Sequence, residues 1–138
     1  RGEKMNNKLN GNEFEKIFAK ALANKGYWVH RIQDNANGQP FDVIAIKDNI
    51  PNVYDCKDCK NNIFKFNRIE DNQRLAFNRY LRCKNFNCFI AIRFEAESNV
   101  AYLVPYESIK KFEKEGYKQL TYKEVKNNVH IHNTIQCC

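Results

Sequence analysis

The sequence has no long apolar run, and this absence excludes one large class of proteins. No stretch approaches the roughly 20 consecutive apolar residues that a membrane-spanning helix needs. No basic segment followed by an apolar one stands at the start, as a secretory signal would require. We therefore expect a cytoplasmic protein that does not interact with a membrane.

Repeats, linkers and low-complexity segments are also missing. Nothing in the composition divides the chain, and 138 residues of which 43% are hydrophobic suffice for one packed core. We expect a single domain over residues 1–138. Residues 1–9 are expected to be a peripheral leader and residues 129–138 a peripheral tail.

Acidic residues are in deficit. The chain has 16 of them against 23 lysines and arginines, which gives a net charge of +7. The excess of positive charge is concentrated between residues 60 and 93, a segment that contains eight basic residues and two acidic ones. A dense basic surface is typical of proteins that hold nucleic acid phosphates, although a solubilising surface accounts for the charge equally well. The candidates for phosphate contacts in this segment are Lys60, Lys65, Arg68, Arg74, Arg79 and Arg82.

Six cysteines raise the alternative of a structural metal site. The pairs Cys56-x2-Cys59 and Cys83-x4-Cys88 have spacings that resemble two halves of a zinc site. Neither pair is surrounded by the glycine or proline of a zinc knuckle. We favour reduced, mostly buried thiols, because free cysteine behaves as a small hydrophobic residue.

Two β-rich runs, residues 41–47 and 53–58, are separated by turn residues and predict a hairpin. If the loop spans residues 47–50, Asp42 falls opposite Asp55, within the roughly 5 Å at which cross-strand pairs interact. Two facing carboxylates repel each other unless a cation lies between them. The hairpin therefore predicts a cluster that needs positive charge.

The tripeptide Asp55-Cys56-Lys57 adds a lysine to this cluster. Side chains alternate along a strand, so Asp55 and Lys57 share one face while Cys56 points to the other. A lysine beside two carboxylates favours a divalent metal that acts on a phosphate over a simple ion pair.

Apolar spacing predicts a first helix that begins near Asn10, with Glu13 completing its cap, and that ends at Gly26. Glu15 lies next to the apolar stripe, so it could reach over the sheet edge toward the carboxylates. A solvated helix glutamate is the simpler interpretation. The stripe consists of Phe14, Ile17, Phe18, Ala21 and Leu22.

A second helix is predicted over about residues 69–83, and Gln73 lies on its apolar face. A lone inward amide needs a partner, which could be a sheet edge, a metal-bound water or a phosphate. Other predicted elements are strands at 27–32, 88–94 and 100–104, a helix at 106–115 and a further helix capped by Thr121.

This order of elements, with an acid on the first helix and a D…(D/E)xK pair on the second and third strands, resembles the PD-(D/E)xK nuclease superfamily. The likeness is greatest to Holliday-junction resolvases of the archaeal and RecU types, over about residues 10–104. As in those enzymes, Gly11 precedes Glu15 by four positions, Arg31 ends the first strand, and Gln73 opens the next helix. The resemblance implies an α/β, restriction-endonuclease-like fold. Its central mixed five-stranded sheet is flanked by helices in an α-β-β-β-α-β-β core.

The same resemblance implies a metal-dependent endonuclease that hydrolyses DNA phosphodiesters, with the four-way (Holliday) junction as the expected substrate. Glu15, Asp42, Asp55 and the backbone carbonyl of Cys56 would hold Mg²⁺ or Mn²⁺, which lowers the pKa of a bound water.

Three further residues receive roles. Lys57 would orient or help to deprotonate the water, and Gln73 would position it. Arg31 would contact a phosphate with both arms of its guanidinium group. A junction has two symmetric cuts to make, so a homodimer is the expected assembly.

Two alternatives stay open. The chain could be a nuclease of the same superfamily that cuts linear or foreign DNA, because the sequence shows no base-reading element. It could also be a catalytically inert nucleic-acid-binding module in which Lys57 merely neutralises the two aspartates.

Overall fold

The computed structural model of the chain describes residues 2–33 and 38–137. None of the helices in these ranges is both long and apolar enough to cross a bilayer. The helices are α1 (Gly2–Asn24), α2 (Asp71–Arg82), α3 (Tyr106–Lys114) and α4 (Tyr122–Asn127), with short 3-10 turns η1 (Phe66–Arg68) and η2 (Glu95–Glu97). The strands are β1 (Trp28–Arg31), β2 (Val43–Lys47), β3 (Ile50–Cys59), β4 (Ile63–Lys65), β5 (Cys88–Phe94), β6 (Val100–Pro105), β7 (Gln119–Thr121) and β8 (Asn133–Gln136).

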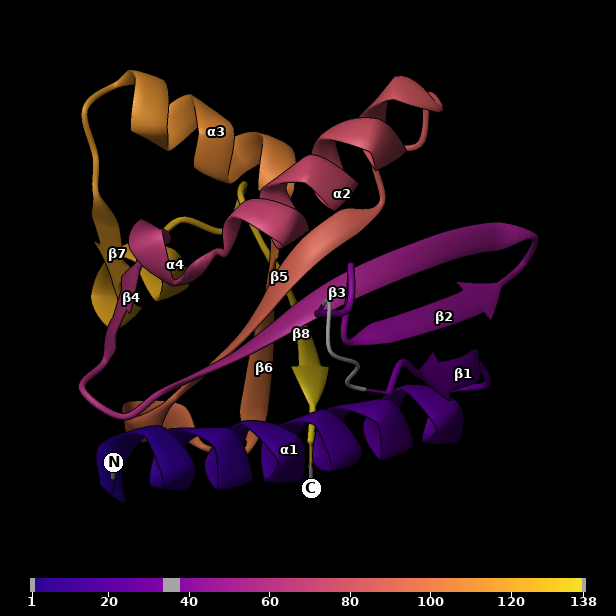
Figure 1. The fold of residues 1–138 in the computed structure, drawn as a ribbon, viewed down its shortest axis with the longest axis horizontal. Helices are drawn as coiled ribbons and strands as arrows, with labels where there is room; N and C mark the ends of the chain where they lie inside the picture. The colour runs from indigo at the N-terminus through magenta and orange to yellow at the C-terminus, as the bar shows by residue number, and fades with distance from the viewer. Residues whose placement is uncertain (1, 34–37, 138) are drawn as a thin grey trace.

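Six strands form one curled sheet in the order β1-β2-β3-β5-β6-β8 (Figure 1). β3 and β5 run parallel, and the other neighbours run antiparallel. A parallel pair needs a long crossover, and α2 lies in that connection. The predicted mixed α/β architecture, consistent with a restriction-endonuclease-like fold, is confirmed.

The chain adds two features to the five predicted strands. Part of the expected tail forms β8, which pairs with β6 at the edge of the sheet and buries Ile135. This corrects the expectation of a peripheral segment over residues 129–138, in which the alternation of Val129, Ile131 and Ile135 with polar residues was the signal of a strand. β4 and β7 pair in a separate two-stranded ribbon.

The sheet is covered on both faces. Figure 1 shows α1 lying along one side of the sheet and α2 and α3 on the other. On the α1 side, Phe18 packs edge-on against Tyr54 with ring centroids 5.0 Å apart. On the α2 side, the ring of Phe77 stacks on that of Tyr106 at 4.7 Å. These two clusters fix the sheet between the helices.

Helix α1 begins at Gly2, so the predicted start near Asn10 is wrong. No proline interrupts the preceding residues, and an Asn-Gly pair inside a helix lowers its stability without ending it. The predicted inward face is confirmed for Phe14, Phe18 and Leu22, which are fully buried.

The hairpin between β2 and β3 has the predicted register. Its two turn residues, Asp48 and Asn49, have φ angles of 52° and 67°, which suit the tight turn that matches the twist of paired strands. The ladder that follows from this turn, extended one residue beyond its last pair, places Asp42 opposite Asp55. A local turn therefore sets the alignment of the two carboxylates.

The buried ring of Phe18 provides a test of the packing on the α1 side. Phe18→Ala should lower the free energy of unfolding by about 3–5 kcal/mol, because it removes a fully buried ring and leaves a cavity. Leu75→Ala, at a position that is 50% exposed, is the control and should change it by less than about 0.5 kcal/mol. Urea unfolding followed by circular dichroism measures both. Equal losses would contradict the packing.

Candidate active site

Four of the residues that the sequence predicts for the site converge between the sheet and the first turn of α2. Asp55 and Lys57 project from β3 on the same face, Gln73 reaches down from α2, and Asp42 stands just before β2. The alternation along β3 directs Cys56 toward α1, as predicted. The arrangement joins two carboxylates, an amide and an ammonium group.

Asp55 is fully buried, and the two oxygens of its carboxylate differ in their hydrogen bonds. Its Oδ1 accepts a hydrogen bond of 3.0 Å from Gln73 Nε2. Within the described residues no group donates a hydrogen bond to its Oδ2. The ammonium of Lys57 lies 3.3 Å from that oxygen as an ion-pair partner. Lys57 is therefore the described charge that compensates Oδ2, through an ion pair and without a well-aligned hydrogen bond.

Asp42 is held on both of its oxygens. Oδ2 accepts a hydrogen bond of 2.7 Å from the backbone N–H of Cys56, and Oδ1 accepts one of 3.0 Å from Gln39 Nε2. The side chain is only 5% exposed. The Cys56 contact crosses from β2 to β3, so the hairpin itself orients this carboxylate.

The electrostatic environment disfavours a charged Asp55. Burial is the main cause that raises its pKa well above the ordinary value, and the nearby Asp42 carboxylate raises it further. Lys57 acts in the opposite direction and lowers it. The thiol of Cys56 also has a raised pKa, through burial first and then through Asp42, Asp55 and Glu15. Burial therefore disfavours an accumulation of negative charge at this point of β3, and the Lys57 ammonium opposes that effect at Asp55.

Gln73 connects the start of α2 to the site. Its Oε1 accepts a hydrogen bond of 2.9 Å from the backbone N–H of Glu70, in a capping box that begins the helix. The same oxygen lies 3.4 Å from Lys57 Nζ, while the amide nitrogen donates to Asp55. The partner that the inward amide requires is thus a carboxylate, and the helix cap fixes the amide's orientation.

Glu15 and Arg31 form a second pair on the α1 side. Arg31 Nη2 lies 3.2 Å from Glu15 Oε2. Glu15 is the acid on α1 for which the sequence predicts a role in metal binding. The Nε of Arg31 is buried and has no acceptor among the described residues. Glu15 thus lies near enough to raise the pKa of Cys56, and Arg31 is an ion-pair partner of Glu15.

The donor set fits a hard divalent cation only in part. Among the described side chains, those of residues 12–33 and 38–137, no three acidic, histidine or cysteine side chains are grouped as a metal site. Asp42 and Asp55 nevertheless supply two adjacent buried carboxylates, and the unsatisfied Oδ2 of Asp55 is an oxygen ligand of the kind that Mg²⁺ and Mn²⁺ prefer. The aspartate pair therefore fits such an ion, and Glu15 would have to leave Arg31 to join it.

The thiols do not form a zinc site in the described residues. Cys56, Cys59 and Cys88 are buried and free, and Cys83 is exposed and free. The favoured interpretation of reduced thiols agrees with this arrangement.

The predicted phosphate contacts lie in different surroundings. Arg68 donates to the carbonyl of Asp58 and to Cys59 Sγ, at 3.1 and 3.2 Å, and shares a hollow of about 340 Å³ with Lys60 and Lys65. Arg74 is bound to Glu113 and to a backbone carbonyl, both at 2.9 Å, so it ties α2 to α3. The exposed residues Arg79 and Arg82 lie on α2.

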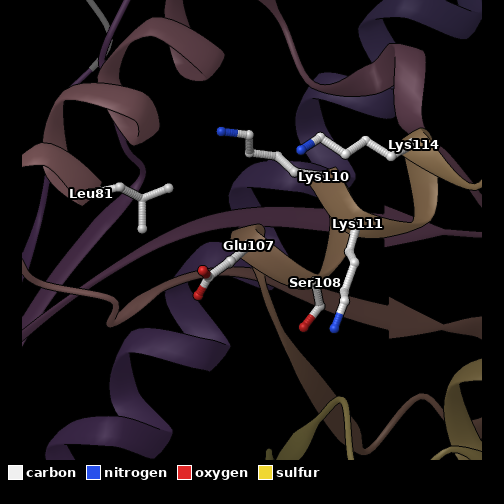
Figure 2. Close-up of a pocket in the computed structure, with 6 residues that line it drawn as sticks. All are labelled: Leu81, Glu107, Ser108, Lys110, Lys111 and Lys114. Carbon is white, nitrogen blue, oxygen red and sulfur yellow. The ribbon is translucent and has the colours of Figure 1, made fainter.

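Sequence reasoning missed two sets of residues. Gln39 and Asn72 lie beside the carboxylates, but a polar loop residue and a helix asparagine carry no local signal. A groove between α2 and α3 gathers further lysines away from the carboxylates (Figure 2). The three lysines of the groove follow a spacing of i, i+1 and i+4 on α3. Because this spacing is visible in the sequence, their location on one side of the helix could have been predicted. The lining residues are Leu81, Glu107, Ser108, Lys110, Lys111 and Lys114.

Comparison with models of known protein families gives a match that covers most of this chain. The model of the family described as RecU, recombination protein U, matches residues 37–137. The matched segment includes Asp42, Asp55, Lys57 and Gln73, and it begins after Arg31. No curated protein gives a significant match.

The buried Asp55 carboxylate should reduce the stability of the metal-free protein. Its pKa is raised in the native state, so between the unfolded and native pKa values the native state binds more protons, and stability falls as pH rises through that window. In EDTA at pH 8, the free energy of unfolding of Asp55→Asn should exceed that of the wild type by about 1–2 kcal/mol. This gain should shrink as the pH falls toward 4.

Asp58→Asn is the control, because Asp58 accepts hydrogen bonds of 3.0 and 2.8 Å from Arg93. This variant should be less stable than the wild type by about 1–3 kcal/mol at pH 8. Urea unfolding between pH 4 and 8 compares the three proteins. If Asp55→Asn is less stable than the wild type at pH 8, the prediction is wrong, and the contacts of Asp55 with Lys57 and Gln73 more than offset the cost of burying its charge.

Proposed function

The chain belongs to the recombination protein U family, a Holliday-junction resolvase family of the PD-(D/E)xK superfamily, and from this premise we propose that it is a metal-dependent endonuclease that cuts four-way DNA junctions. The observation that carries the proposal is the pair of facing buried carboxylates, Asp42 and Asp55, with Lys57 on the same face. A structural role alone does not explain why two acids are buried side by side, since each raises the cost of the other.

A divalent ion held by Asp42, Asp55, the Cys56 carbonyl and Glu15 would supply an activated water and offset the charge that develops on the phosphate. The protein's own groups set the geometry. The Cys56 N–H fixes one oxygen of Asp42, and the Gln73 amide fixes one oxygen of Asp55. Both carboxylates keep their orientation while the phosphate binds, which is the preorganisation that this chemistry needs.

Lys57 is the group placed to handle a proton or a developing charge. Its ammonium lies between Asp55 Oδ2 and Gln73 Oε1, at 3.3 and 3.4 Å, and 12% of its side chain is exposed. We assign it to orient the attacking water and to neutralise charge on the phosphate oxygen. Gln73 assists by holding the ammonium on the site side of α2.

Arg31 is the proposed phosphate contact nearest the site. Its buried Nε–H has no acceptor among the described residues, and a planar guanidinium group suits two phosphate oxygens. A phosphate bound there would compete for Arg31 with Glu15, 3.2 Å away. Binding of DNA would thereby free Glu15 to join the aspartates.

The remaining cations would hold the DNA backbone on either side of the cut. Lys60, Lys65 and Arg68 surround one hollow, and Arg79 and Arg82 stand exposed on α2. A junction requires two symmetric cuts, so we propose a homodimer that carries one such site per protomer. We also propose a cytoplasmic location, with which action on DNA is consistent.

Cleavage of labelled DNA tests the proposal. Wild-type protein in Mg²⁺ should nick a four-way junction at symmetric positions and leave a linear duplex of the same sequence intact. EDTA should abolish the nicking. Lys57→Gln should lower the rate by at least about 100-fold, because general acid–base and charge stabilisation contribute on that scale. Denaturing gels of both strands measure the products.

Lys47→Gln is a matched control, because Lys47 belongs to the same hairpin but binds the carbonyl of Lys25 on the α1 side. It should cut at the wild-type rate. Cleavage of both DNAs would keep the nuclease and remove the junction specificity. Binding of both DNAs without cleavage in Mg²⁺ or Mn²⁺ would instead favour an inert binding module.

A further inference from the structure

The first turn of α2 reaches both carboxylates by separate routes. Gln73 donates directly to Asp55 Oδ1 at 3.0 Å. Its neighbour Asn72 donates from Nδ2 to the backbone carbonyl of Gln39 at 3.1 Å, and Gln39 Nε2 donates to Asp42 Oδ1 at 3.0 Å. Two consecutive residues of one helix therefore hold one aspartate each, Gln73 directly and Asn72 through Gln39.

Gly38 makes the Asn72 route possible. Its φ is +75°, a conformation that favours glycine, and an added Cβ would lie 2.8 Å from Asn72 Nδ2. That is closer than such contacts allow, so any side chain at residue 38 would displace the asparagine amide. A side chain at residue 38 would therefore act on the Asn72 side chain, the group that donates to Gln39.

We propose that Gln39 and Asn72 are positioning residues that hold the Asp42 carboxylate for the divalent ion. The inference rests on the proposed function, and it adds residues to which no role was assigned. Asp42 precedes β2 and lies beyond the last ladder pair, so the sheet alone does not fix both of its oxygens. With the Cys56 N–H on Oδ2 and the Gln39 amide on Oδ1, the carboxylate plane is set. Substitution of groups that orient a metal ligand in this way commonly lowers the affinity for the metal by about 10–100-fold.

The test measures metal binding without DNA. Mn²⁺ should raise the melting temperature of the wild type, and its midpoint concentration should increase about 10-fold in Gln39→Met and in Gly38→Ala. Gly116→Ala is the matched control for Gly38→Ala, because its φ is +94° and an added Cβ meets nothing within 4 Å. This control should keep the wild-type Mn²⁺ midpoint, even if its melting temperature without metal falls.

Asn72→Leu provides a second variant that keeps the approximate size of the side chain and removes the donor to Gln39 without adding charge. It should also raise the Mn²⁺ midpoint, and the DNA affinity measured in EDTA should stay unchanged in every variant. Wild-type midpoints in Gln39→Met and Asn72→Leu would overturn the positioning role while the proposed function stands. If Mn²⁺ does not stabilise the wild type, the metal site of the proposed function falls and the positioning role falls with it.

An independent feature is the α2–α3 groove, a hollow of about 500 Å³ (Figure 2). Lys110, Lys111 and Lys114 line it from α3, and Glu107 is the acid that lines it with them. Lys111 and Lys114 have no ion-pair partner among the described residues, so their charges are free for a ligand. Leu81 of α2 lies across from the lysines.

Contacts between the two helices hold the groove in a fixed place relative to the carboxylates. Arg74 binds Glu113 at 2.9 Å, and Lys110 Nζ donates to Asn78 Oδ1 at 3.3 Å. Gln73 at one end of α2 touches Asp55, and Leu81 lines the groove eight residues further along, a rise of about 12 Å. One rigid helix therefore spans both places.

We infer that the α2–α3 groove binds the phosphodiester backbone of the DNA substrate away from the cleaved bond. Three ammonium groups against one carboxylate complement a polyanion, and the rigid link to the active site suits a ligand that extends over both. This inference also rests on the proposed function. It names a contact outside the basic segment 60–93.

The test compares the salt dependence of junction binding in EDTA. Replacing Lys110, Lys111 and Lys114 together by glutamine should reduce the slope of log affinity against log salt by about 2.7, since each of the three phosphate contacts contributes close to 0.9. The control replaces the exposed lysines Lys16, Lys20 and Lys123, which makes the same change in net charge. Its slope should match the wild type.

Equal slopes in the wild type and the groove variant, or equal reductions in the groove variant and the control, would overturn the groove as a DNA contact. Cleavage by the wild type would in that case leave the proposed function intact. A wild type that binds no DNA would overturn both.

Discussion

The hydrogen bond between the Gln73 amide and the Asp55 carboxylate is the interaction on which the site depends. It joins the centre of the sheet to the first turn of α2, and it satisfies one oxygen of a fully buried acid. The same glutamine closes the capping box that begins α2. The start of the helix and the orientation of the carboxylate are therefore fixed by one side chain. Its neighbour Asn72 extends this control to Asp42 through Gln39.

The rest of the fold supports this contact by holding two layers against the sheet. The α1 side contributes aromatic packing of Phe18 on Tyr54, and the α2 side contributes the stack of Phe77 on Tyr106. Between them, Asp55 keeps an oxygen that no described donor satisfies. An apolar residue there would cost less, so the buried acid is better explained by its use than by stability. Membership of a junction-resolvase family agrees with that use.

The parts of the site that depend on local rules could be predicted from the sequence. The Asp48-Asn49 turn and the alternation along a strand determine which residues face each other, so the pairing of Asp42 with Asp55 follows from the hairpin alone. The inward position of Gln73 follows from helical spacing. Contacts between distant elements were not accessible, because the Asn72 bond to Gln39 depends on how a loop meets a helix 33 residues away. The early start of α1 was missed because the residues before Asn10 are polar and carry no apolar stripe. The edge strand β8 was missed although Val129, Ile131 and Ile135 alternate with polar residues, because a position at the end of the chain favours the interpretation as a tail.

Crystallographic location of Mn²⁺ tests the central claim most directly. Anomalous difference density from crystals soaked in Mn²⁺ should show a peak bound by carboxylate oxygens of both Asp42 and Asp55, with Lys57 displaced from Asp55 Oδ2. Crystals of Asp42→Asn should show a much weaker peak or none. If the wild type shows no density between the two aspartates and Lys57 stays on Asp55, the pair is an ion-paired structural cluster and the account of a metal-dependent nuclease is wrong.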